Sequence, residues 1–193
     1  MRQADCQPAL HEPASLEDVD GFVSAERRES LTTAAGTLRL QPIEGVHYRL
    51  VRPVSHYHGH LTEIYRDDWS LTDAALVQVT MTTTFPGRIR AWGLHRSTID
   101  RLFAATGSLM IVCYDARRTS PTYRAINEFM LGGRNQGLVL IPPGVYHGWK
   151  NIGDDEATII SMPSRLYDYE APDRWELAWD SAAAQATIPY RWP

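Results

Sequence analysis

His95 is the first residue of this chain whose type and position suit proton transfer. It closes the stretch RAWGLH at residues 90–95, which follows the run QVTMTTT at residues 78–84. That run alternates like a strand that lines a cavity. Imidazole changes its charge near neutral pH, so His95 is a candidate general base. The alternative for a single histidine in a strand is a structural role.

His147 is the second candidate and lies in the stretch GLVLIPPGVYHGW at residues 137–149. An apolar strand, a Pro-x-Gly turn and x-x-His resemble the second sequence signature of the cupin jelly roll, in which the turn directs the histidine into the mouth of the barrel. In many cupins this histidine binds a metal together with a His-x-His pair and a glutamate from the first motif. Here the first motif holds only His95, followed by Arg96 and Ser97. Because the usual ligand set is missing, we predict no metal and no cofactor.

Three further histidines, His56, His58 and His60, alternate along one short segment. They could lie on one face of a strand and bind a metal. The sequence places no further ligand beside them, so we favour the alternative, an exposed polar segment at the rim of the barrel.

Short β-branched and apolar segments with Gly- and Pro-rich turns make up most of the chain after residue 37. Many short strands at regular spacing are typical of a β-sandwich or barrel. Together with the resemblance of residues 137–149 to the cupin signature, this predicts an all-β cupin jelly roll over residues 38–193, with a short C-terminal helix between Pro172 and Ala186. The predicted strands cover residues 48–54, 61–65, 75–84, 88–94, 101–105, 108–115, 126–131, 137–141 and 157–162.

Residues 1–37 differ from the rest because they are polar and contain Pro8 and Pro13. We interpret them as an N-terminal extension that either packs on a neighbour or stays partly disordered.

Composition narrows the class of protein. The 193 residues are 44% apolar and 22% charged, with a net charge of −4, and no basic patch suggests nucleic acid as a partner. We expect no signal peptide, because residues 1–10 lack an apolar core, and no run approaches membrane-spanning length. Cys6 and Cys113 fall in a predicted tail and a predicted strand, so we expect no disulfide and a reducing compartment. We expect a cytoplasmic protein without membrane or nucleic-acid partners.

Several stretches together resemble the dTDP-4-dehydrorhamnose 3,5-epimerase family of cupins. They occur in the family's order and extend over about residues 38–193. The matching stretches are GHLTE at 59–63, Gln78, GLH at 93–95, DARRTSPT at 115–122, IPPG through HG at 141–148, WD at 179–180 and the closing residues 188–193.

The resemblance implies a metal-free homodimer that binds a nucleoside-diphospho-4-keto-6-deoxy sugar, as an isomerase of carbohydrate biosynthesis. It implies that His95 removes the proton α to the ketone, that Asp180 orients His95, and that Arg101 takes the place of the family lysine near the enolate oxygen. The residues that the resemblance places around the substrate are Glu63, Gln78, Arg90, Trp92, Arg117, His147, Ser161, Tyr167 and Tyr169. For Arg117 a structural ion pair is the alternative.

Three positions depart from the family pattern. Trp92 and His58 replace arginines, and Arg90 lies two residues before Trp92 on the same strand face. Ser161 replaces the tyrosine that returns a proton to the opposite face of the sugar. We therefore predict inversion at a single carbon, or isomerisation, in place of a double epimerisation. The alternative is a cupin that binds a small sugar or acid, without catalysis or with a different reaction.

Overall fold

The computed structural model describes residue 34 and residues 42–193. The predicted extension, residues 1–37, lies outside the described residues except for residue 34, and so does Cys6. The fold below is that of residues 42–193.

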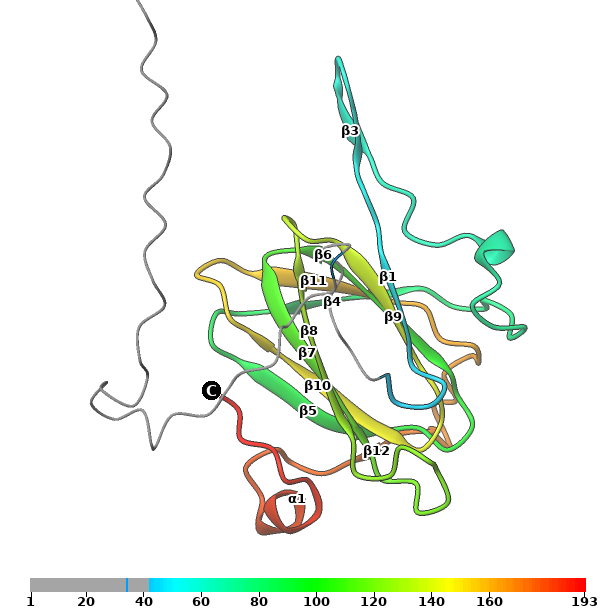
Figure 1. Cartoon of the computed structure of the whole chain (residues 1–193), viewed down its shortest axis with the longest axis vertical. Helices are drawn as coiled ribbons and strands as arrows, with labels where there is room; N and C mark the ends of the chain where they lie inside the picture. Colours follow the sequence, from blue (N-terminus) through cyan, green and yellow to red (C-terminus); the bar gives the residue numbers. More distant parts are fainter. Residues whose placement is uncertain (1–33, 35–41) are drawn as a thin grey trace, which may run out of the picture. The chain divides into compact units, whose positions relative to one another are not determined.

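Two five-stranded sheets form the body of the fold, and every strand pair within them is antiparallel. Consecutive strands from β4 to β7 alternate between the two sheets, and Figure 1 shows the sheets face to face. The prediction of an all-β jelly roll is therefore confirmed. The first sheet has the order β1 (His47–Leu50), β9 (Gly137–Ile141), β6 (Asp100–Thr106), β11 (Ala157–Ser161) and β4 (Thr80–Thr84). The second has the order β12 (Trp175–Glu176), β5 (Ile89–Leu94), β10 (Val145–Asn151), β7 (Ser108–Asp115) and β8 (Ile126–Gly132).

Strand β7 shows how the sequence forms these layers. Its apolar residues are buried on both faces, because Leu109 and Ile111 enter the core between the sheets while Met110 and Val112 pack under the C-terminal segment. Successive side chains of a strand point to opposite faces, so a continuous apolar run fits a strand that is covered twice.

Three short elements lie outside the two sheets. A hairpin of β2 (Val54–His56) and β3 (Gly59–Leu61) extends beyond them, as Figure 1 shows. A 3₁₀ helix, η3, covers Asp67–Trp69, and the short helix α1 covers Ala182–Thr187. The three histidines of the hairpin are exposed, as expected, but Val54, Tyr57 and Leu61 of the same hairpin are exposed as well, so the segment is not purely polar.

Some element boundaries differ from the prediction. The helix expected over residues 172–186 begins only after Ser181, whose side chain accepts a hydrogen bond from the Ala184 amide at 3.1 Å. Before it, Trp175 and Glu176 pair with β5 as β12, because strand pairing at this open edge overrides the helical tendency of the sequence. Residues 61–65 form a strand only at Leu61, and Val145–Asn151 is a strand that the sequence analysis did not predict.

Among the described residues, no helix is long and apolar enough to cross a membrane.

Candidate functional site

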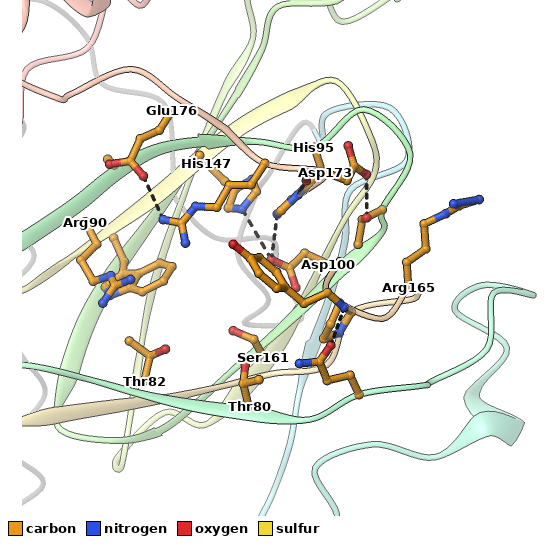
Figure 2. A pocket seen from close by; sticks show the side chains of 18 of the residues that line it. Thr80, Thr82, Arg90, His95, Asp100, His147, Ser161, Arg165, Asp173 and Glu176 are labelled. Atoms are coloured by element: carbon orange, nitrogen blue, oxygen red, sulfur yellow. Dashed lines mark hydrogen bonds and ion pairs between the residues drawn. The ribbon is translucent and has the colours of Figure 1, made fainter. Parts of the chain in front are cut away.

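A cavity of about 1010 Å³ lies between the two sheets, and the segment 163–180 forms part of its wall. The first sheet contributes hydroxyl side chains and the second contributes bases and a guanidinium (Figure 2). The strand residues that line it include Thr80, Thr82, Asp100 and Ser161 from the first sheet, and Arg90, Gly93, His147 and Trp149 from the second.

His95, Asp100 and His147 come together at one wall of this cavity. Asp100 Oδ2 lies 3.7 Å from His95 Nε2 and 3.6 Å from His147 Nε2. The two imidazole centroids are 5.6 Å apart, and Figure 2 shows both rings turned toward the carboxylate. His95 follows the end of β5, His147 is on β10 and Asp100 begins β6, so both sheets contribute to the cluster.

Gly148 allows β10 to lie close to β5 beside this cluster. A Cβ atom at Gly148 would lie 2.2 Å from the Ala91 Cβ, which is closer than real atoms approach. The register between the two strands shifts at this point, between His147 and Trp149. The glycine is therefore required by the packing that brings His147 opposite Gly93.

Both histidines are oriented by main-chain carbonyl groups. His95 Nδ1 contacts the Asp173 carbonyl oxygen, and His147 Nδ1 lies 3.2 Å from the Val145 carbonyl oxygen. A carbonyl oxygen can only accept, so Nδ1 carries the proton in each ring. Nε2 of each histidine is consequently directed at Asp100 and the cavity.

Asp173 fixes the segment that holds His95. Its carboxylate accepts hydrogen bonds from the Arg96 amide at 2.8 Å, the Ser97 amide at 2.9 Å and the Thr98 hydroxyl at 2.7 Å. Burial alone would raise the pKa of Asp173, but these hydrogen bonds outweigh it and lower the pKa. The residues after β5 and the segment 163–180 are thus joined where His95 lies.

The charges of the cluster support one another. Burial disfavours the charged forms of both Asp100 and His95. The neighbouring imidazoles nevertheless hold the pKa of Asp100 well below its usual range. In the same way burial lowers the pKa of His95, while Asp100 and the Asp173 carbonyl more than compensate and raise it. His95 is therefore a somewhat stronger base than a free imidazole.

Most of the predicted substrate residues lie in the cavity wall. Gln78 Oε1 accepts a hydrogen bond from the Tyr167 amide at 2.8 Å, and the guanidinium of Arg90 lies 5.6 Å from the centre of the Trp149 ring. The predicted residues that line the cavity are Gln78, Arg90, His95, His147, Ser161, Tyr167, Tyr169 and Asp180.

Arg101 does not face the cavity, contrary to the prediction. It is fully buried on the other face of β6, where its Nη1 donates to the Met162 carbonyl oxygen at 3.0 Å and its Nη2 to that of Ala74. Adjacent residues of a strand point to opposite faces. Because Asp100 faces the cavity, Arg101 cannot, and it packs 5.3 Å from the centre of the Tyr65 ring.

Asp180 lies in the cavity wall, but the described residues show no hydrogen bond or ion pair between its side chain and His95. Both ring nitrogens of His95 already face other oxygens, those of Asp173 and Asp100. The carboxylate beside His95 is therefore Asp100, which the resemblance did not indicate.

Three other predicted substrate residues lie outside the cavity wall. Arg117 forms the structural ion pair that was the alternative, with its Nε 2.8 Å from Asp115 Oδ1. Trp92 is 1% exposed and packs against Tyr190 and Trp192, because it faces the C-terminal segment. Glu63 is exposed and pairs with Arg66 at 3.0 Å.

The sequence analysis missed Asp100 and Asp173. Asp173 belongs to no strand and reaches His95 only through the path of segment 163–180. Asp100 carries a detectable signal, because a carboxylate at the start of a mostly apolar strand requires a partner. Its neighbours are 47 and 5 residues away in the sequence, so only the fold identifies them.

The antiparallel double sheet, with two histidines and a carboxylate in the cavity between the sheets, has the architecture of a cupin jelly roll. The chain belongs to the dTDP-4-dehydrorhamnose 3,5-epimerase family, whose sequence profile matches residues 41–189. It is therefore an epimerase-like enzyme of the isomerase class.

Individual relatives agree with this assignment. The probable low-salt glycan biosynthesis epimerase Agl13 of Haloferax volcanii is 34% identical over 139 residues, which are 72% of this chain and 89% of the relative. A dTDP sugar isomerase of Desulfovibrio desulfuricans G20 has the same fold, with a TM-score of 0.71, 24% identity, and coverage of 80% of this chain and 94% of that chain. A double mutant of a 3'-monoepimerase from Streptomyces bikiniensis, solved with dTDP, has a TM-score of 0.68 at 18% identity, with coverage of 80% and 77%.

Proposed function

We propose that this enzyme removes the proton α to the ketone of a dTDP-4-keto-6-deoxy sugar, with His95 as the base. The observation that carries the proposal is the placement of His95, with Nδ1 on the Asp173 carbonyl oxygen and Nε2 turned to the cavity beside Asp100. A proton α to a carbonyl is weakly acidic, and its removal needs a positioned base of near-neutral pKa.

The enolate formed in this step needs a positive partner on its oxygen. Since Arg101 faces away, we assign this role to protonated His147, whose ring centroid lies 5.6 Å from that of His95. Asp100, between the two rings, takes the orienting role first assigned to Asp180 and stabilises whichever imidazolium is present. Arg90, in the same cavity, is suited to the diphosphate, because a guanidinium fork binds phosphate oxygens in pairs.

Ser161 supports reaction at a single carbon. It lies on β11 of the first sheet, whereas both histidines lie on or beside strands of the second. A serine hydroxyl is a poor acid, so the first-sheet strand residues described in the cavity wall offer no side chain equivalent to the tyrosine that the resemblance expects at this position. Inversion at one carbon, or isomerisation with solvent as the acid, fits this arrangement.

We also propose a homodimer, located in the cytoplasm. The β2–β3 hairpin exposes large apolar side chains, with Val54 65%, Tyr57 96% and Leu61 57% exposed. An apolar surface of this kind suits a protein contact. The buried free thiol of Cys113 fits a reducing compartment. Sedimentation equilibrium of the wild type and of Tyr57→Ser tests the dimer.

The test of the proposed reaction is exchange of the substrate α-protons with deuterated water, followed by NMR. In His95→Asn the exchange rate should fall by about two to four decades, the usual contribution of a general base. His47→Asn changes an exposed histidine on β1, outside the cavity wall, so it is the matched control and should exchange like wild type. An unchanged rate in His95→Asn would show that another residue is the base.

A further inference from the structure

The cluster of His95, Asp100 and His147 has an excess of acceptor atoms. Each histidine carries its proton on Nδ1, because that nitrogen faces a carbonyl oxygen, so Nε2 of the neutral ring is an acceptor. The ionised carboxylate of Asp100 is an acceptor as well. Three electron-rich groups therefore face one another, at 3.6 and 3.7 Å from Oδ2 to each Nε2, which is too long for hydrogen bonds.

Only added positive charge makes this arrangement favourable, and it can be supplied as protons or as a metal ion. We infer that the cluster binds one divalent transition-metal ion of the zinc class through His95 Nε2, Asp100 and His147 Nε2. Among the described residues, these three form the one group whose ligand atoms all lie within 4.8 Å of one another. Asp100 supplies the third ligand that the sequence motifs lack.

The distances fit a zinc ion better than a hard cation. Bonds of about 2.0–2.2 Å at tetrahedral angles place ligand atoms about 3.3–3.5 Å apart. The two distances from Asp100 Oδ2, 3.6 and 3.7 Å, exceed this by only a few tenths of an ångström, and all three ligand atoms lie within 4.8 Å of one another. Two imidazoles and one carboxylate are also a donor set typical of zinc and its neighbours, not of magnesium or calcium, which prefer oxygen ligands.

The surroundings of the ligands suit metal binding too. A histidine that binds a metal usually donates its other N–H group to a carbonyl or carboxylate, which fixes the ring. His95 and His147 both do so, to the carbonyl groups of Asp173 and Val145. All three ligands line the cavity, so a fourth position is accessible to water or to a substrate oxygen.

A bound metal ion would occupy the Nε2 lone pair of His95, which must accept the substrate proton in the proposed reaction. Metal binding and proton abstraction should therefore exclude each other, and zinc should act as an inhibitor. The inhibition rests on the proposed function, whereas the binding does not.

Binding is tested by isothermal titration of the tag-free, chelator-treated full chain with Zn²⁺, together with the absorption spectrum of Co²⁺ added in its place. We expect one ion per chain, a tetrahedral Co²⁺ spectrum and a rise in Tm with Zn²⁺ concentration. Asp100→Asn and His147→Gln should each weaken binding by at least about tenfold, since even residues behind the ligands contribute this much. The two variants are made separately, and a Tm measured without metal shows that each is folded.

The matched control is the double variant His58→Gln/His60→Gln, which removes histidines from the exposed hairpin and should bind Zn²⁺ like wild type. The inference is wrong if Zn²⁺ does not bind, if binding survives in Asp100→Asn and in His147→Gln, or if it is lost in the hairpin variant.

The activity measurement separates this inference from the proposed function. Substrate α-proton exchange should occur in the metal-free protein, stop with one equivalent of Zn²⁺ and return with chelator. Exchange without any metal binding overturns the inference alone. Metal binding without exchange in the metal-free protein overturns the proposed function alone. Exchange that continues at full rate with bound Zn²⁺ overturns the predicted exclusion.

Discussion

Two buried aspartates, Asp100 and Asp115, lie at strand ends of the same fold but have different surroundings. The Asp115 carboxylate accepts hydrogen bonds from Arg117 Nε at 2.8 Å, Ser120 Oγ at 2.6 Å and Thr122 Oγ1 at 2.7 Å. Within residues 42–193, the partners of Asp100 Oδ2 are only two imidazole nitrogens, at 3.6 and 3.7 Å, and the side chain borders the cavity. In both cases neighbouring groups outweigh burial and lower the pKa of the carboxyl.

The difference separates a structural carboxylate from one that is available for chemistry. Every oxygen of Asp115 has fixed partners, so its charge stabilises the fold and cannot easily take up another role. Asp100 has partners that exchange protons or bind metal, so its charge can respond to what enters the cavity.

The largest effect is expected for Asp100→Asn. The amide keeps the shape of the side chain but removes the charge that orients His95 and stabilises its protonated form. We expect the rate of substrate α-proton exchange to fall by about two decades or more, within the range for acid–base groups. The free energy of unfolding, measured with urea, should change little. A normal exchange rate would show that Asp100 does not act on His95.

Asp115→Asn should have the opposite profile. It leaves the guanidinium of Arg117 without its carboxylate and disturbs the hydroxyl partners, so we expect the free energy of unfolding to fall by about 3 kcal/mol. Exchange per folded molecule should equal that of wild type, because Asp115 lies outside the cavity wall. Loss of exchange with an unchanged free energy of unfolding would contradict the structural role assigned to Asp115.

The pH dependence of stability follows from the same carboxylate. The pKa of Asp115 is lower in the folded state than in the unfolded state, so the unfolded chain binds more protons as the pH falls. The contribution of Asp115 is complete above its unfolded pKa of about 3.9 and is lost progressively below it. Urea unfolding at a series of pH values should show a shallower loss of stability in acid for Asp115→Asn than for wild type.

Arg101→Met tests the corrected role of that arginine. The change removes two hydrogen bonds to main-chain carbonyls and one buried Nε without a partner among the described residues. The loss of the two hydrogen bonds is partly offset by removal of the unpaired buried Nε, so we expect the free energy of unfolding to fall by only about 1–2 kcal/mol. The exchange rate should not change. A drop of two decades would restore Arg101 as the cation near the enolate.

Ser161→Tyr should give the smallest effect. A phenol on β11 would place an acid on the wall opposite the histidines. We expect wild type to convert little or no dTDP-4-keto-6-deoxyglucose by double inversion, and the variant to gain about tenfold, less than a fully positioned acid provides. The assay couples the product to its 4-reductase and follows nicotinamide oxidation. Efficient turnover by wild type would show that another acid fills the role.

The sequence by itself determined the fold class and the two histidines. Short alternating segments with Gly and Pro turns fix a β-sandwich, because the period of the side chains is local information. The stretches around His95 and His147 are also local, and both side chains line the predicted cavity. Gln78, Arg90, Ser161, Tyr167 and Tyr169, which the sequence analysis assigned to the substrate site, also line this cavity.

Only the tertiary structure decided which charged groups meet these histidines. Asp100 and Arg101 are neighbours in sequence, yet one faces the cavity and the other the opposite side of β6, and a shift of one residue exchanges them. Asp173 reaches the end of β5 through a segment without regular structure. Which carboxylate orients His95 is therefore a property of strand register and loop path, which depend on contacts between residues far apart in the chain.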